Sequence, residues 1–133
     1  MTNKSKKILS EISPGELLDK ISILEIKFEK VKDKNYQKEI KKEYKILKEI
    51  QNSSIKLEDD IKVLFRSIKE INLSLWDVED HLRICEKNKD FGEKFIKLSR
   101  NVHFLNDERS QIKLEINNLT DSKIKEVKQY TSY

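Results

Sequence analysis

Residues 13–27 read SPGELLDKISILEIK, and this stretch decides the fold that we predict for the chain. Ser13 is suited to accept a hydrogen bond from the backbone N–H of Glu16 as a helix N-cap. Pro14 then occupies the first helical position, where its missing N–H costs nothing. Glu16 follows the cap at the third position and completes the pattern of a capping box. We therefore expect a helix from about residue 14 to about residue 32.

Apolar residues recur every three or four positions after this start, as in Leu17, Ile21 and Leu24, which is typical of an amphipathic helix. Similar stripes continue along the chain between short polar breaks. They predict three further helices, at about 36–51, 56–88 and 91–119. Asn35 is the expected N-cap of the second helix, and Asp90 that of the last.

The fold class that these helices predict is all-α, an antiparallel helical bundle of about four helices in which the last two are long. We expect a single domain over residues 1–133. The lead-in 1–12, where Ile8, Leu9 and Ile12 would pack beside the first helix, and the tail 121–133 are expected to be flexible or to lie along the bundle. Near-heptad spacing in the third helix leaves a self-associating coiled coil as an alternative.

The charge balance of the chain argues against several classes of function. Its 28 basic and 24 acidic residues give a net charge of +4, but they are interspersed, and this pattern argues against nucleic acid as a partner. Cys85 is the single cysteine and cannot form an intrachain disulfide. The sequence contains no apolar run long enough for a membrane span and no secretory signal, so we expect a cytoplasmic protein.

Three polar clusters interrupt the amphipathic pattern and are candidates for a ligand-binding site. The first helix carries Glu16, Asp19, Lys20 and Lys27, and the third carries Trp76, Asp80 and Arg83. The last helix carries Arg100, His103, Asn106, Asp107 and Lys113, and its polar stripe continues at helical spacing to Asn117. Such a stripe suits hydrogen bonds in a helix–helix seam or to a ligand.

Two interpretations of these clusters follow. In one, they converge and bind a small anion such as a phosphosugar, because Arg and Lys side chains suit anions. In the other, they form a buried network that fixes the helix register, and the surface recruits a protein partner or a second copy. We favour the second interpretation. A bound anion or a concave basic pocket near Lys20 would favour the first, and a fully satisfied network the second.

An enzyme is the alternative to a binding module. Glu16 with Asp19, and Asp77 with Asp80, are acidic pairs spaced i, i+3, as in all-α nucleotide pyrophosphohydrolases that hold Mg²⁺ between helices. This spacing is common in any charged helix. The sequence contains no phosphate-binding glycine loop, zinc motif or nucleophile–base pair. We therefore predict no catalytic residue, no metal ligand and no cofactor.

The segments 13–27, 75–83 and 95–117 together resemble the DUF6165 family of small helical bacterial proteins. The resemblance rests on Ser13-Pro14-Gly15-Glu16-Leu17 with Asp19-Lys20, on Leu75-Trp76 with Asp80 and Arg83, and on Asn106-Asp107 with Arg109, Lys113 and Asn117. It implies a helical fold and, through the proteins that accompany the family, a link to carbohydrate or surface-polysaccharide metabolism. It implies no reaction mechanism.

Overall fold

The computed structural model describes residues 5–133, and within them the chain forms helices and no strand. The helices are α1 (Pro14–Lys30), α2 (Lys34–Ser54), α3 (Asp59–Lys87) and α4 (Glu93–Leu119). The predicted fold class is confirmed: the chain is an all-α antiparallel bundle, and its last two helices are long. No described helix is both long and apolar enough to cross a membrane.

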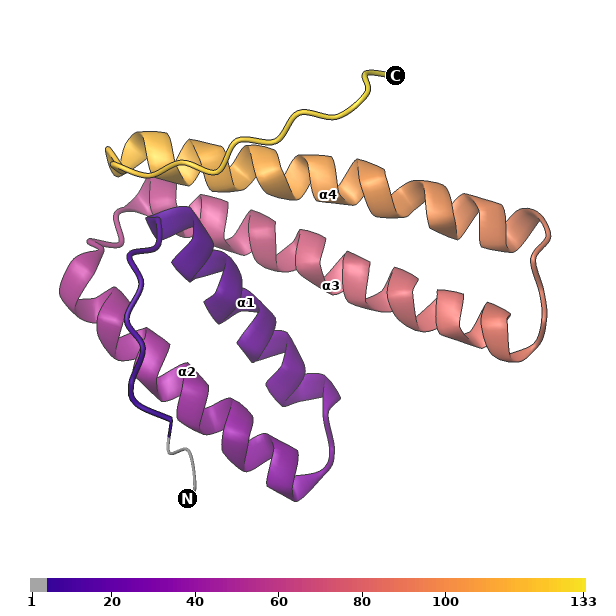
Figure 1. Cartoon of the computed structure of the whole chain (residues 1–133), viewed down its shortest axis with the longest axis horizontal. Helices are drawn as coiled ribbons and strands as arrows, with labels where there is room; N and C mark the ends of the chain where they lie inside the picture. The colour runs from indigo at the N-terminus through magenta and orange to yellow at the C-terminus, as the bar shows by residue number, and fades with distance from the viewer. Residues whose placement is uncertain (1–4) are drawn as a thin grey trace.

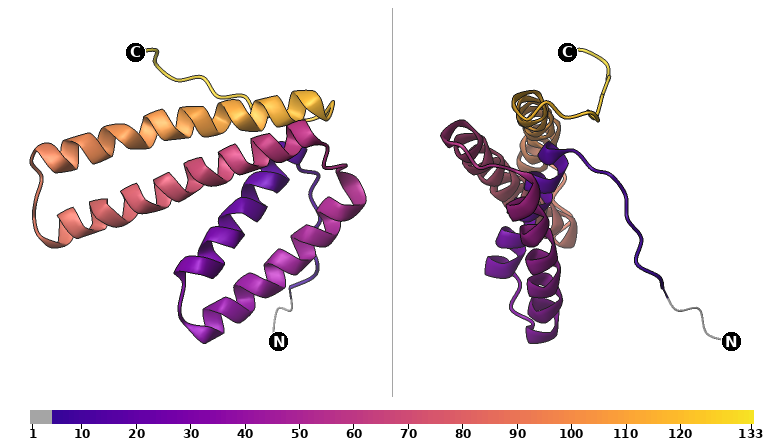
Figure 2. Two further views of the ribbon diagram at one scale, coloured as in Figure 1. Left: turned by 180° about the vertical axis from the view of Figure 1, so that it is seen from behind. Right: turned by 90° about the vertical axis from the view of Figure 1, so that its left-hand side faces the viewer.

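The bundle consists of two helical hairpins that meet at an angle (Figures 1 and 2). Helices α1 and α2 form one hairpin, and α3 and α4 form the other. Helix α1 packs against both α3 and α4. Among the described helices, α2 contacts α1 and neither of the other two. The two hairpins therefore diverge from a shared end, and the turn that joins α3 to α4 extends away from α1 (Figure 1). The expected packing of the first helix beside the third and fourth is confirmed.

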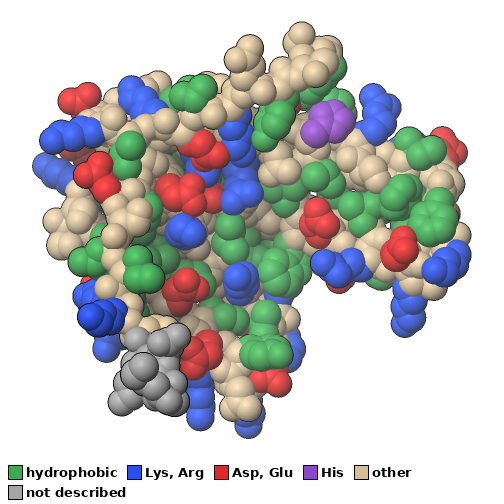
Figure 3. Space-filling view, viewed as in Figure 1, with side chains coloured by type: hydrophobic (Ala, Val, Ile, Leu, Met, Phe, Trp, Pro, Cys, Tyr) green, Lys and Arg blue, Asp and Glu red, His purple; other side chains and the backbone are tan. Residues whose placement is uncertain are grey.

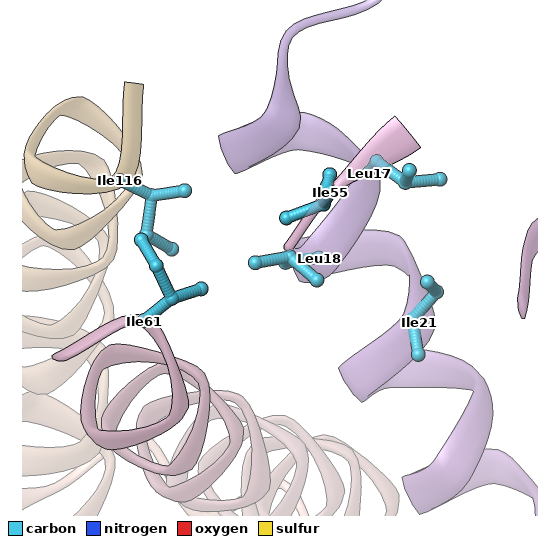
Figure 4. Packing of buried hydrophobic residues seen from close by; sticks show 6 residues of the cluster. All are labelled: Leu17, Leu18, Ile21, Ile55, Ile61 and Ile116. Carbon is cyan, nitrogen blue, oxygen red and sulfur yellow. The ribbon is translucent and has the colours of Figure 1, made fainter. Parts of the chain in front are cut away.

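The apolar core lies at the shared end, and all four helices contribute side chains to it. Leu17, Leu18 and Ile21 of α1 pack there with Ile61 of α3 and Ile116 of α4. Figure 4 shows Ile61 and Ile116 pointing toward one another, with Leu18 directed at them from α1. Burial of aliphatic side chains of this size stabilises a fold by roughly 1.5–3 kcal/mol each. The core thus anchors the α1 end that carries the polar cluster.

Helix α1 begins as predicted, but two other predicted caps are wrong. The Ser13 hydroxyl accepts from the backbone N–H of Glu16 at 3.1 Å. Helix α2 is capped by Asp33 and not by Asn35, because the Asp33 carboxylate accepts from two backbone N–H groups at the helix start. At α4 the N-cap is Gly92. Asp90 instead accepts from the Gly92 N–H at 3.2 Å, in the turn before the helix.

Two further expectations, the helix boundaries around residue 55 and the packing of the lead-in, differ from the structure. The second helix runs to Ser54, and the third starts at Asp59, because Ile55–Glu58 form a link that is not helical and whose first residue is buried. In the lead-in, Ile8 and Leu9 are exposed, so they do not pack beside α1; its first four residues lie outside the described part of the chain. The tail after α4 is not helical and runs back along that helix (Figure 1).

Candidate functional site: a buried charge network and the cleft beside it

The carboxylate of Asp19 is the centre of a polar network between α1, α3 and α4. Asp19 lies two turns into α1 and is only 1% exposed, because α1 is packed between the other two helices at this point. Arg109 of α4 donates from Nε to Oδ1 at 2.9 Å and from a terminal nitrogen to Oδ2 at 2.6 Å. This bidentate geometry is the strongest form of an ion pair between side chains. It raises the pKa of Arg109 further, although burial acts in the opposite direction.

Asn72 of α3 connects the third helix to the same carboxylate. Its amide nitrogen donates to Asp19 Oδ1 at 2.9 Å and to the Ser22 hydroxyl at 2.8 Å. Ser22 in turn donates to the backbone carbonyl of Asp19 at 2.7 Å. Asn72 and Ser22 are both buried, so these hydrogen bonds are protected from water. One carboxylate therefore fixes α1 to α3 and α4 together.

Lys113 forms the second half of the network, one turn beyond Arg109 on α4. Its ammonium donates to Glu16 at 2.7 Å and to Glu126 of the tail at 2.9 Å, and it lies 4.0 Å from Asp19. Burial alone would lower the pKa of Lys113, but the bonds to the two glutamates outweigh it and leave the pKa raised. Lys113 therefore stays charged and attaches the tail to the bundle.

The network is complete within the chain. Among residues 5–133, every fully buried side-chain nitrogen and oxygen has a hydrogen-bond partner. A buried acceptor or donor without a partner would cost roughly 1–3 kcal/mol, so a satisfied network is a stable arrangement in itself. This is the outcome that favours a structural network over a site that waits for an anion.

A cleft opens directly beside this network, in the angle between α1 and the α3–α4 hairpin. Its volume is about 590 Å³. It is lined by Ile23 and Ile26 of α1, by Asn72, Leu75, Trp76, Glu79, Asp80 and Arg83 of α3, and by Asn106 and Arg109 of α4. The cleft and the network thus share two members, Asn72 and Arg109.

The lining of the cleft is mixed in polarity and balanced in charge. Ile23, Ile26, Leu75 and Trp76 give it an apolar part, whereas its two arginines match its two carboxylates. Figure 3 shows hydrophobic side chains and charges of both signs interleaved on the face where α1 meets α3 and α4. A small-molecule pocket is usually more apolar and more enclosed than this. The cleft therefore resembles a surface groove more than a closed pocket.

The structure brings some predicted residues together and leaves others apart. Glu16, Asp19 and Lys113 meet in the network, and Trp76, Asp80, Arg83 and Asn106 meet in the cleft. Lys20 is exposed and lies 3.8 Å from Glu16 in a surface ion pair. Lys27 lines a hollow on the α2 side of α1. The three clusters predicted from sequence therefore do not form one site.

The remaining predicted residues, Arg100, His103 and Asp107, lie along α4 on the side that the tail follows. The ring of Tyr133 packs edge-on against His103, and its hydroxyl donates to Asp107. Arg100 stacks over Phe104, 5.9 Å from the ring centre. His103 and Asp107 hold the end of the tail, Arg100 packs on Phe104 of the same helix, and none of the three lines the cleft.

The prediction missed four members of the network: Ser22, Asn72, Arg109 and Glu126. Two of them left a signal in the sequence. Asn72 occupies a position of the α3 apolar stripe between Ile68 and Leu75, where a polar residue needs a buried partner. Arg109 stands one turn before Lys113 and so shares its helix face. Glu126 gave no signal, because it follows the last helix.

The acidic pairs considered for Mg²⁺ are used in other ways. Glu16 is bound to Lys113 and Asp19 to Arg109, while Asp77 lies 3.6 Å from Lys30. Among residues 5–133, no three histidine, cysteine or acidic side chains lie close enough to hold a metal ion together.

The chain was also compared with known proteins. A family model described as "Family of unknown function (DUF6165)" matches residues 8–133. No curated protein matches the chain, and no solved structure does. The match spans both hairpins and includes every residue of the network and of the cleft.

Proposed function

We propose that this chain, which belongs to the DUF6165 family, is a non-catalytic interaction module that recruits a protein partner through the cleft between its hairpins. The network supplies the rigid part of this module, because Asp19, Asn72 and Arg109 fix the angle between the hairpins. The cleft supplies the contact surface. Its partner is a segment that carries apolar side chains together with charges of both signs, such as an amphipathic helix.

The observation that supports a protein partner most directly is the lining of the cleft. A partner helix places apolar side chains in a groove and charges at its edges. Here Trp76 lies among aliphatic residues, and Glu79 and Arg83 are exposed beside it. Tryptophan and arginine are enriched among the residues that dominate protein–protein affinity. We therefore assign Trp76 as the main anchor and Arg83 as the charged contact.

Site-specific photo-crosslinking tests this proposal. A photoreactive phenylalanine analogue replaces Glu79 at the edge of the cleft, and a matched variant carries it at Tyr36, an exposed aromatic position on α2. In the cells that make the protein, we expect a discrete protein adduct from position 79 alone. Arg83→Glu should abolish the adduct. Because Arg83 is exposed on α3, the variant should remain folded. Equal adducts at both positions, or none at 79, would contradict the proposal.

A small anion in the same cleft is the second candidate, supported by the two arginines that line it. The ligand would be a sugar phosphate or nucleotide sugar, in keeping with a role in carbohydrate or surface-polysaccharide metabolism, and an enzyme acting on such a compound is the further alternative. Trp76 is the single tryptophan of the chain, so its fluorescence reports on the cleft alone. Saturable quenching by such a compound, lost in Arg83→Gln, would favour this candidate over a protein partner.

A further inference from the structure

A second hollow lies where α2 ends and α3 begins. Figure 1 shows the position of these two helix ends. Its volume is about 490 Å³. It is lined by Leu18 of α1, by Lys48 and Gln51 of α2, by Leu57 of the link, and by Asp59, Lys62, Val63, Phe65 and Arg66 of α3. We call it the corner pocket. It shares no residue with the cleft or with the Asp19 network.

The charge of the corner pocket is its distinguishing property. Lys48, Lys62 and Arg66 supply three positive charges and Asp59 one negative charge, so the lining has a net charge of +2. By the same count the cleft is neutral, with two arginines and two carboxylates. Two hollows beside α1 and α2, one of them also lined by Lys69 of α3, are neutral as well, each with two lysines and two glutamates. The corner pocket therefore carries an excess that its neighbours lack.

The three cations of the corner pocket are also not neutralised by ion pairs. None of the ion pairs formed among residues 5–133 includes Lys48, Lys62 or Arg66. Lys62 and Arg66 stand one turn apart on α3 and so project from the same face. Like charges at this spacing on a helix repel one another. A bound anion would remove that repulsion.

Gln51 places a further polar group at the base of the corner pocket. The residue is only 1% exposed, yet it lines the hollow. Its side-chain oxygen accepts from Lys48 at 3.2 Å. Its amide nitrogen donates to no other described residue. Every fully buried side-chain nitrogen among residues 5–133 has a partner, so this nitrogen must keep some exposed surface. The amide is therefore a donor available to a ligand alongside the three cations.

The rest of the lining is apolar. Leu18 and Leu57 form the inner wall, and Phe65 and the half-exposed Val63 lie beside the cations on α3. A ligand that matches both parts of the pocket joins an anionic head to an apolar body. A phosphate monoester carries roughly −1.5 to −2 charges at pH 7 and three acceptor oxygens, which corresponds to the net +2 and the donors of the lining.

We propose that the corner pocket binds an organic phosphate monoester whose organic part is apolar. Lys62 and Arg66 hold the phosphate from α3 and Lys48 holds it from α2, with the Gln51 amide as an additional donor. Phe65, Leu57 and Leu18 contact the organic part. Because the end of α2 and the start of α3 both line this pocket, the ligand would also link these two helices.

Phenyl phosphate is the probe for this site, and amide NMR of the full chain is the measurement. We expect saturable shifts at Gln51, Val63 and Phe65, with no change in Trp76 fluorescence. Lys62→Gln with Arg66→Gln should weaken binding about a hundredfold, because each of the two lost bonds to a charged group is worth about tenfold. The control Lys38→Gln with Lys42→Gln removes two exposed lysines one turn apart on α2 and should bind normally.

Two comparison compounds separate the parts of the proposal. Benzenesulfonate keeps the ring but carries one charge, and inorganic phosphate keeps the charge but lacks the ring. Both should bind more weakly than phenyl phosphate. Absence of shifts at the corner, equal weakening in the α2 control, or equal binding of all three compounds would overturn the proposal. None of these outcomes bears on the cleft, whose test uses crosslinking at position 79.

Discussion

Arg109 on α4 donates two hydrogen bonds, at 2.9 and 2.6 Å, to the carboxylate of Asp19 on α1, ninety residues earlier in the chain. The acceptor is almost completely buried, whereas the side chain of Arg109 is 29% exposed and reaches the cleft. The pair therefore connects the interior to the proposed contact surface. The pair also holds the start of α1 against α4, and the bond from Asn72 to Asp19 holds the same segment against α3.

Asp19→Ala should destabilise the chain by about 3 kcal/mol or more. The change leaves Arg109 without its acceptor and removes one acceptor of Asn72, and loss of one partner of a buried pair is typically worth 3–5 kcal/mol. Urea unfolding followed by circular dichroism gives the free energy of unfolding. Asp80→Ala is the control, since Asp80 is exposed and forms no ion pair among the described residues; it should change stability by less than about 0.5 kcal/mol. Equal losses in both variants would show that the Asp19 pair has no special weight.

Gly15→Ala should destabilise α1 where it meets α4. A Cβ at this position would lie 2.5 Å from the backbone oxygen of Lys113 and 2.8 Å from the side-chain oxygen of Asn117. The same Asn117 oxygen accepts from the Gly15 N–H at 2.8 Å. The helices would have to separate, and overpacking of this kind costs about 1–3 kcal/mol.

Gly92→Ala is the matched control for this effect. A Cβ at Gly92 would meet Asp90 at 3.5 Å, an ordinary contact. The expected loss is below about 1 kcal/mol, because alanine is a poorer N-cap than glycine. Thermal unfolding of both variants decides the matter: a Gly15 variant that melts no earlier than the Gly92 variant would contradict the close approach of α1 to α4.

These contacts show how far the sequence predicts the structure. The helices follow from apolar periodicity, and the start of α1 follows from Ser13 and Pro14, because both signals are local. The polar stripe of α4 correctly indicated a helix seam, since Lys113 and Asn117 bond to the first turn of α1. The pairing of Asp19 with Arg109 could not be predicted from the sequence. Spacing of i, i+3 and i, i+4 describes the face of one helix and does not show which helices pack against each other.

The separation of the candidate residues into two places also depends on tertiary geometry. Trp76 and Arg83 were predicted to join the polar residues of α1, but the angle between the hairpins places them along a cleft outside the network. Caps were mispredicted for a related reason. Asp33 and Asn35 are both good cap residues, and the choice between them depends on where the turn after α1 allows the chain to become helical.

Acid should release the tail from the bundle. The hydrogen bond from Lys113 holds the pKa of Glu126 below its usual value of 4.5, although burial acts weakly in the opposite direction. A carboxyl whose folded pKa is lowered stabilises the fold above its unfolded pKa, and this contribution is lost as the pH falls through the folded pKa. The segment around Glu126 therefore stays attached at neutral pH and detaches from α4 as the pH falls below about 4.5.

The tail effect is measured by comparing the full chain with a variant that ends at residue 122. The full chain should melt at a higher temperature at pH 7, and the difference should shrink as the pH falls below about 4.5. Glu126→Gln should reduce the difference already at pH 7. A difference in melting temperature that does not vary with pH would show that Glu126 does not hold the tail.

The end of the tail should detach in alkali, through a different pair. Tyr133 donates its hydroxyl to Asp107, and this hydrogen bond raises the pKa of Tyr133 above the usual value of 10.0. A group whose folded pKa is raised stabilises the fold below its unfolded pKa, and the contribution is lost as the pH rises through the folded pKa. Above pH 10 we therefore expect the phenolate to leave the carboxylate and the ring to separate from His103 and Phe104.

Titration by NMR with labelled tyrosine follows this residue separately from Tyr44, whose pKa is raised by burial and by Glu25. Asp107→Asn should bring the Tyr133 pKa back toward 10.0 and leave that of Tyr44 unchanged. If the Tyr133 pKa is the same in both proteins, Asp107 is not the partner of the Tyr133 hydroxyl, and this hydrogen bond does not hold the end of the tail.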